Sequence, residues 1–212
     1  MTLQVSETLN PNNAALLLID HQVGTMNFGI SDLSALELKN QTLLLAEAAR
    51  AFGLPVVLTA SNPNGPNGPI FPELLAAVPG VPVIERLIID SWKDPRFVEA
   101  VKKTGRKKLI MAGVSTDVCL TLPAVSAVRD GYDVYAVVDA SGTFSQHALM
   151  ASMFRMSQAG VVIANATMLV SELLADWSSK YAEPIGKILG ARVPNFGFVA
   201  AAFNHRPARS SV

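Results

Sequence analysis

Six short runs rich in Val, Ile and Leu recur along this 212-residue chain, and longer amphipathic stretches separate them. Each run is continuously apolar, a pattern typical of strands that are covered on both faces of a sheet. Strands that alternate with helices predict a parallel sheet joined by right-handed crossovers. The predicted strands cover residues 14–19, 55–60, 81–84, 108–114, 133–138 and 161–164, and the predicted helices cover residues 35–52, 72–77, 95–103, 117–130, 146–159 and 169–178.

The expected architecture is an α/β fold, a three-layer doubly wound sandwich around a six-stranded, mainly parallel sheet of Rossmann-like order 3-2-1-4-5-6. The third strand belongs at an edge of this sheet, because Pro82 lies within its run and cannot donate a ladder hydrogen bond. Residues 62–69, NPNGPNGP, predict either an ordered loop over the carboxyl edge or a simple spacer. We place one domain over residues 1–182 and a tail over residues 183–212. Since the tail carries three Phe residues, we expect it to pack on its own domain or on a neighbouring subunit.

The charge content narrows the classes of partner. Lys plus Arg and Asp plus Glu both number 17, so the formal net charge is zero, and charged residues make up only 16% of the chain. Proteins that bind nucleic acid need a basic face to meet phosphates, so this balance argues against that partner. No apolar run reaches the ~18 residues of a membrane span, and the first ten residues lack the features of a secretory signal. We expect a cytoplasmic protein whose partner is a small molecule or another copy of itself, with no nucleic-acid or membrane partner.

The motifs of several enzyme classes do not occur in the sequence. It has no GxGxxG after a strand, no GxxxxGK[ST], no HExxH and no GxSxG. A single Cys excludes an intramolecular disulfide and a Cys-cluster zinc site. His21, His147 and His205 lie far apart, and no second His or carboxylate stands at a recognisable ligand spacing from His21. We therefore expect neither a metal nor a cofactor.

The single Cys falls at the predicted ligand-binding crevice. In a doubly wound sheet of this order, ligands bind beyond the carboxyl ends of the first and fourth strands, where the strand order reverses. Asp20 closes the first strand, and Ser115, Thr116 and Cys119 follow the fourth. We therefore expect the Cys119 thiol to face the Asp20 carboxylate.

The residues around Cys119 predict a reactive thiol. Ser115 or Thr116 is a suitable N-cap, which places Cys119 in a first helical turn where the helix dipole and unpaired N–H groups favour a thiolate. Pro123 has no N–H to bond the Cys119 carbonyl, so we expect a distorted turn whose backbone donors can hold an oxyanion. The alternative is that Cys119 is a small buried hydrophobic residue and that Asp20 is a turn or cap residue.

Three segments resemble those of the isochorismatase-like cysteine hydrolases: AALLLIDHQ (14–22), AGVSTDVC (112–119) and LPAVSAVRDGYDVYAVVDASGTF (122–144). GPNGP (65–69), the segment around Trp92 and RMSQAG (155–160) resemble the YcaC-like branch of this superfamily. The similarity runs from about Ala14 to Trp177. Several motifs agree in order and spacing, which makes this resemblance more specific than any single match.

The resemblance implies a triad of an Asp, a basic residue and a Cys, here Asp20, Arg86 and Cys119. The basic residue is usually Lys in this superfamily, and the YcaC-like branch is similar to this chain in using Arg. Because Arg remains charged, Arg86 can orient Asp20 and stabilise negative charge but cannot shuttle protons, which leaves Asp20 as the general base. The alternative for Arg86 is a surface ion pair with Glu85 or Asp90.

The resemblance further implies a cis peptide at Val114–Ser115, an oxyanion hole made by the backbone N–H groups of Ser115 and Cys119, and a homo-oligomer, with an octamer among the assemblies that relatives form. The metal ligands of the nicotinamidases have no equivalent here, so we do not expect a nicotinamidase. Members that cleave isochorismate need no Cys nucleophile, so the presence of Cys119 disfavours that reaction as well. Five further side chains follow strand ends or lie in adjoining loops and are candidates to line the pocket, each with a packing role as the alternative: Gln22, Phe28, Ser61, Trp92 and Phe144.

These features together predict a cysteine-dependent hydrolase that cleaves a small-molecule amide-like C–N bond or an ester bond through a thioester intermediate. In that reaction Asp20 accepts the thiol proton and Cys119 attacks the carbonyl carbon. Two alternatives use the same crevice. One is a non-catalytic protein that binds a small molecule, and the other is a thiol redox sensor.

Overall fold

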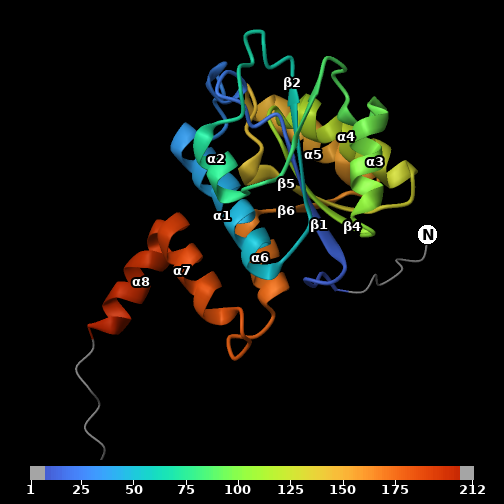
Figure 1. The fold of residues 1–212 in the computed structure, drawn as a ribbon. Coiled ribbons are helices and arrows are strands. Elements are labelled where there is room, and N and C mark those ends of the chain that lie inside the picture. The colour runs from blue at the N-terminus through green and yellow to red at the C-terminus, as the bar shows by residue number, and fades with distance from the viewer. Residues whose placement is uncertain (1–7, 206–212) are drawn as a thin grey trace, which may run out of the picture.

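Six parallel strands form a single sheet in the order β3-β2-β1-β4-β5-β6. The structure, a computed structural model, describes residues 8–205 (Figure 1). The predicted fold class and strand order are confirmed, and β3 lies at an edge with Pro82 just before its first residue. The strands are β1 (Ala14–Ile19), β2 (Val56–Ser61), β3 (Val83–Arg86), β4 (Lys108–Gly113), β5 (Asp133–Val137) and β6 (Val162–Ala164).

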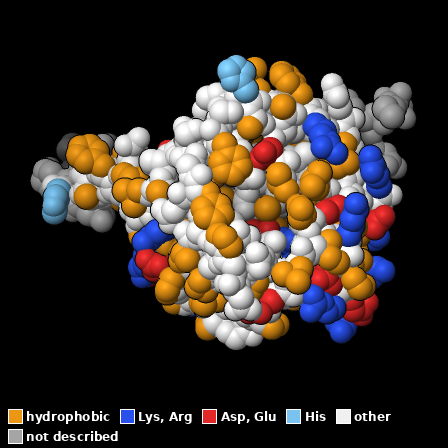
Figure 2. Space-filling view, turned by 90° about the horizontal axis from the view of Figure 1, so that it is seen from above, with side chains coloured by type: hydrophobic (Ala, Val, Ile, Leu, Met, Phe, Trp, Pro, Cys, Tyr) orange, Lys and Arg blue, Asp and Glu red, His pale blue; other side chains and the backbone are white. Residues whose placement is uncertain are grey.

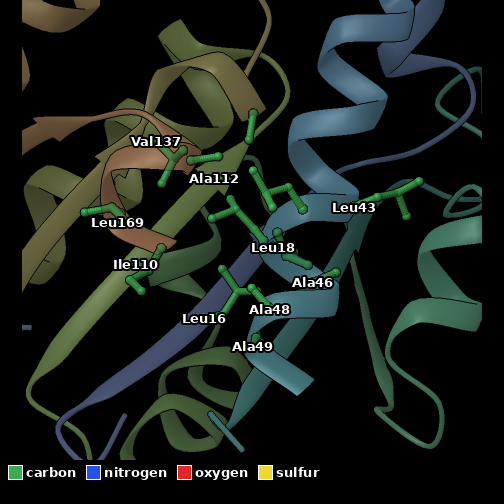
Figure 3. Close-up of a cluster of buried hydrophobic side chains, with 14 of the residues drawn as sticks. Leu16, Leu18, Leu43, Ala46, Ala48, Ala49, Ile110, Ala112, Val137 and Leu169 are labelled. Carbon is green, nitrogen blue, oxygen red and sulfur yellow. The ribbon is translucent and has the colours of Figure 1, made fainter. Parts of the chain in front are cut away.

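Helices cover both faces of this sheet: α1 (Ala35–Phe52), α2 (Pro72–Ala77), α3 (Pro95–Lys103), α4 (Thr121–Arg129), α5 (Gln146–Gln158) and α6 (Ala166–Leu174). Successive side chains of a strand point to opposite faces, so the central strand β1 supplies both cores. Leu16 and Leu18 pack with α1 and α6, the core that Figure 3 shows, while Ala15 and Leu17 pack with α3, α4 and α5. Every residue of β1 is buried, which explains its uninterrupted apolar run.

Two predicted helices differ from the observed ones. The helix expected over residues 117–130 is divided into a π-helical turn, Thr116–Leu120, and α4. The helix expected to begin at Leu169 begins at Ala166, because the Asn165 side chain accepts a hydrogen bond from the Met168 N–H at 2.8 Å and caps the first turn.

The C-terminal segment, expected to be a tail rich in turn residues, forms two helices, α7 (Ala182–Arg192) and α8 (Pro194–Asn204). Helix α7 packs against α1, where Arg192 pairs with Glu47. Helix α8 crosses α7 so closely that a Cβ on Gly197 would lie 2.4 Å from the Gly190 carbonyl oxygen, which explains the glycine there. None of the helices within residues 8–205 is long and apolar enough to cross a membrane.

Candidate active site

The ends of three strands bring the predicted triad together at the carboxyl edge of the sheet. Ile19, the last residue of β1, pairs with Gly113, the last residue of β4, so Asp20 and the turn that carries Cys119 begin side by side. Arg86 is the last residue of β3 and pairs with Ser61 at the end of β2. A parallel sheet therefore places all three side chains at one edge without any long-range loop.

Arg86 and Asp20 form a fully buried ion pair. Nη2 of Arg86 donates to Oδ2 of Asp20 at 2.6 Å, and neither side chain is exposed to solvent. The alternative surface pairing of Arg86 with Glu85 or Asp90 is therefore wrong. Since a buried charge without a partner is very costly, the two residues depend on each other.

Other groups fix the orientation of the Arg86 guanidinium. Its Nε donates to Oγ1 of Thr59 at 3.2 Å, and its Nη1 donates to the carbonyl oxygens of Ile88 and Ile89, the latter at 2.8 Å. These bonds and the one to Asp20 use four of the five N–H donors of the guanidinium. Thr59 was not among the residues predicted from the sequence; its place near the end of β2, beside the strand that carries Arg86, was the available signal.

Asp20 adopts an unusual backbone conformation that directs its carboxylate. Its φ is 61°, in the left-handed region that Asp tolerates better than most residues. Hydrogen bonds hold it there, since its N–H donates to the Thr59 carbonyl at 2.9 Å and its own carbonyl accepts from the Thr25 hydroxyl at 2.6 Å. With Oδ2 bound by Arg86, the buried Oδ1 has no hydrogen-bond partner among residues 8–205. An unpaired carboxylate oxygen of this kind is suited to accept a proton.

The Cys119 thiol lies against the Asp20 carboxyl, and each group alters the pKa of the other. Burial raises the pKa of the thiol well above its ordinary value, the charge of Asp20 raises it further, and Arg86 only partly opposes this. Burial also raises the pKa of Asp20, against the opposing effects of Arg86 and the thiol. The expectation of a resting thiolate is therefore wrong. The helical turn cannot offset burial beside a carboxylate, and the resting thiol keeps its proton.

Cys119 lies in the π-helical turn Thr116–Leu120, and the residue itself remains partly exposed. Pro123, which cannot donate to the Cys119 carbonyl, agrees with the expected distortion of the helix at this point. The N-cap position belongs to Ser115, although its side chain makes no capping hydrogen bond. The thiol is thus carried by a widened turn directly after β4 and not by a regular α-helix.

The backbone donors differ from those expected for an oxyanion hole. The Ser115 carbonyl accepts hydrogen bonds from three N–H groups, including that of Cys119 at 2.8 Å. The Cys119 N–H is therefore already paired, contrary to the expectation that it would be free. The Ser115 N–H has no acceptor within the described part of the chain. The Val114–Ser115 peptide is cis, as the resemblance implies.

Gly113 provides the space in which the Cys119 turn lies. A Cβ at this position would be 2.8 Å from the Cys119 carbonyl oxygen and 2.9 Å from its carbonyl carbon, so Gly113→Ala must displace the turn. We expect this substitution to lower kcat on an accepted substrate by about a hundredfold, because a displacement near 1 Å misaligns the nucleophile. The matched control is Gly186→Ala in α7, where the added Cβ meets only Trp177 at 3.9 Å. Equal kcat values for the two variants would contradict this role of Gly113.

Gln22 and Ser61, two of the predicted pocket residues, hold the loop of residues 62–69 in place. The buried Gln22 side chain accepts from the Ser61 N–H at 2.9 Å and donates to the Ser61 and Gly68 carbonyls. Gly24 lies against this loop, where a Cβ would be 2.0 Å from the Pro66 carbonyl oxygen. Both residues therefore hold the loop, which is ordered over the carboxyl edge instead of being a spacer, and their contact with a substrate stays a prediction.

The three aromatic candidates divide between core and surface. Trp92 is buried, and its indole N–H donates to Asp130 at 2.8 Å. Phe28 and Phe144 are each about half exposed and lie on neighbouring loops. A hydrogen bond joins these loops, since the Ser31 hydroxyl donates to the Phe144 carbonyl at 2.6 Å. These two are the pocket candidates with large exposed apolar surface.

His21, next to Asp20, is a core residue. Its Nε2 bonds to the Ala140 carbonyl at 2.9 Å, and burial lowers its pKa to about 4, so the ring is neutral at physiological pH. No cluster of three or more His, Cys, Asp or Glu side chains within residues 8–205 is arranged to hold a metal ion.

Cys119 thus lies beside a buried Asp–Arg pair at the switch point of a doubly wound sheet. This arrangement is typical of a cysteine-dependent active site. Residues 14–168 match the family model of the isochorismatase domain. The chain belongs to the isochorismatase family, as the sequence resemblance predicted, and its similarity lies with the YcaC-like branch.

Relatives from two bacteria share most of the chain. The protein named probable hydrolase YcaC from Escherichia coli is 41% identical over 189 residues, covering 89% of this chain and 90% of the relative. YcaC from Pseudomonas aeruginosa, solved with hexane-2,5-diol and covalent acrylamide, is 43% identical with a TM-score of 0.90, covering 94% of this chain and 98% of its own. The solved E. coli YcaC gene product, named an octameric hydrolase of unknown specificity, is 40% identical with a TM-score of 0.89, covering 93% and 96%.

Proposed function

We propose that this protein is a hydrolase that cleaves an amide-like C–N bond or an ester bond of a small molecule through a thioester on Cys119. The observation that carries the proposal is the unpaired Oδ1 of Asp20, a buried carboxylate oxygen beside the thiol whose partner oxygen is held by Arg86. The names of its YcaC relatives, a probable hydrolase and a hydrolase of unknown specificity, support the same reaction class.

In the first half of the reaction, Cys119 attacks the carbonyl carbon while its proton passes to Oδ1 of Asp20. Because the thiol has a raised pKa, proton transfer accompanies attack instead of preceding it. The carbonyl oxygen takes up the electron pair, and the N–H of Ser115, which has no acceptor among the described residues, stabilises it. When the C–N or C–O bond breaks, the leaving amine or alcohol takes the proton from Asp20, and a thioester remains.

In the second half, Asp20 accepts a proton from water as the water oxygen attacks the thioester carbonyl carbon. The C–S bond then breaks, the carboxylic acid leaves, and the sulfur of Cys119 recovers the proton from Asp20. Arg86 stays charged throughout and stabilises the Asp20 carboxylate. The net reaction consumes one amide or ester and one water, and it needs no cofactor.

The surroundings of the thiol favour this function over the redox-sensor alternative. Redox-sensing cysteines are accessible and have a low pKa. Burial and the Asp20 charge raise the pKa of Cys119, so its reaction with peroxide is expected to be slow.

Intact-mass spectrometry tests the proposal. Incubation with a panel of small amides, carbamates, hydroxamates and esters, followed by rapid acid quench, is expected to reveal the mass of an acyl group on Cys119. A sulfenic adduct at low peroxide, with neither turnover nor an acyl adduct from any member of the panel, would instead support the sensor. Acrylamide, which is covalently attached in the P. aeruginosa relative, is the positive control for access to the thiol.

We propose further that the protein forms a homo-oligomer, as its octameric E. coli relative does. Large exposed apolar side chains and the low charge content support this, since contiguous apolar surface marks interfaces. Phe198, Val199 and Phe203 of α8 are all exposed. The cytoplasmic location expected from the sequence stays a prediction.

A further inference from the structure

Three consecutive aliphatic residues stand exposed beside the candidate active site. Directly after β3, Leu87 is 80% exposed, Ile88 43% and Ile89 64%. An uninterrupted exposed run of this kind is unfavourable in water unless something covers it. Figure 2, a view onto the carboxyl edge, shows hydrophobic side chains gathered around a hollow on this face.

This segment, residues 87–89, is attached to the catalytic machinery by its backbone. Nη1 of Arg86 donates to the carbonyl oxygens of Ile88 and Ile89, and Nη2 of the same guanidinium donates to Asp20. A single rigid, planar group therefore joins the exposed segment to the proton acceptor of the site. Any contact that orders the segment also orders Arg86 and, through it, Asp20.

The high solvent exposure of residues 87–89 argues against a small substrate as the group that covers this segment. Side chains that line a ligand pocket are largely enclosed before the ligand arrives, whereas Leu87 projects almost entirely into solvent. Phe28 and Phe144 add further half-exposed apolar surface on neighbouring loops at the same edge. An extended apolar surface of this kind matches a protein interface.

We infer that a second copy of this chain covers residues 87–89, so that subunit association completes the mouth of the active site and holds Arg86 in place. This inference rests on the self-association proposed above. The chain also offers complementary surface for such a contact, because α8 contains no charged residue and exposes Phe198 and Val199. Helix α8 lies at the end of the molecule away from the carboxyl edge, so that a contact between these two surfaces would be head-to-tail (Figure 1).

Sedimentation over a range of protein concentrations tests this inference without any substrate. The variant Leu87→Gln/Ile89→Thr is expected to associate about tenfold more weakly than the wild type or worse, because it makes the covered surface polar. The matched control is Met168→Gln/Val162→Thr, which makes the same kind of change at two other exposed apolar residues, 52% and 48% exposed, outside this edge. The control is expected to associate like the wild type.

A third variant tests the connection to the site. Arg86→Lys keeps the charge beside Asp20 but cannot make all the bonds to Thr59, Ile88 and Ile89, so it is expected to weaken association in the same direction. Wild-type association of Leu87→Gln/Ile89→Thr would overturn the inference, even if its KM for an apolar amide rose, because the segment would then serve the substrate. A monomeric wild-type protein would also overturn it. Neither result bears on the thioester, which the acyl adduct on Cys119 tests separately.

Discussion

Cys119→Ala is expected to lower kcat for any accepted amide or ester by at least about a thousandfold, because no other group in the site can form the thioester. Residual turnover would come from substrate positioning and from water activated by Asp20. The loss should appear in kcat and kcat/KM together, since the thiol acts on the transition state and not on ground-state binding. Steady-state rates of hydrolysis with the wild type and the variant measure it.

Two controls separate chemistry from folding. Cys119→Ser keeps the size of the side chain but replaces the thiol by a hydroxyl that is much harder to ionise, and the raised pKa of the thiol already shows that this site disfavours an anion. We expect the Ser variant to fold like the wild type and to be almost as inactive as the Ala variant. Wild-type turnover in Cys119→Ala, with an unchanged melting temperature, would exclude covalent catalysis through this residue.

The strand order and the meeting of Asp20 with Cys119 were predictable from the strand pattern of the sequence, and for a simple reason. Continuous apolar runs mark strands buried on both faces, and parallel strands deliver their last residues to the same edge. Once the strands were placed, the positions of Asp20 and Cys119 relative to their strand ends followed. Arg86 was predicted only from the family resemblance, because the third strand was expected to end at residue 84, whereas β3 continues to Arg86.

The ionisation of the site was not predictable from the same pattern. The sequence placed Cys119 at a helix start, where a thiolate is usually favoured, but local sequence does not show how deeply a group is buried or which charge lies against it. The carboxylate of Asp20 comes from another strand, and its effect outweighs that of the turn. For the same reason, the hydrogen bonds that hold three of the five pocket candidates, Gln22, Ser61 and Trp92, were not predictable. Their neighbours, such as Asp130 beside Trp92, are distant in sequence.

Helices α7 and α8 were missed because their composition resembles that of loops. Gly and Pro occur within both, and these residues normally interrupt helices. Here Pro194 occupies the first turn of α8, where its missing N–H costs nothing, and Gly197 allows the two helices to cross closely. This glycine thus serves helix contact, a tertiary effect that no local pattern reveals.

Arg86→Met is expected to lower the free energy of unfolding by about 3–5 kcal/mol, the usual cost of removing one partner from a buried ion pair. Both charged side chains are fully buried, so the Asp20 carboxylate would be left without a counter-charge and two backbone carbonyls would lose their donor. Urea denaturation at neutral pH measures the effect. The size of this loss distinguishes the buried pair from a surface ion pair, which contributes about 1 kcal/mol or less.

The pH dependence and a double variant identify the cause of that loss. In the absence of Arg86, burial should raise the pKa of Asp20 further. As the pH falls, the folded protein then takes up a proton on Asp20, whereas the carboxyl of the unfolded chain stays ionised until the pH is near 3.8. The folded state then binds more protons, and the stability deficit of Arg86→Met relative to the wild type should shrink as the pH falls from neutrality.

The double variant Asp20→Asn/Arg86→Met carries no buried charge at this pair. Because Asn also tolerates the left-handed conformation of residue 20, this variant should be more stable than Arg86→Met at neutral pH. If instead the double variant were no more stable and the deficit did not change with pH, the loss would come from packing and from the unpaired carbonyls of Ile88 and Ile89, and not from the charge of Asp20.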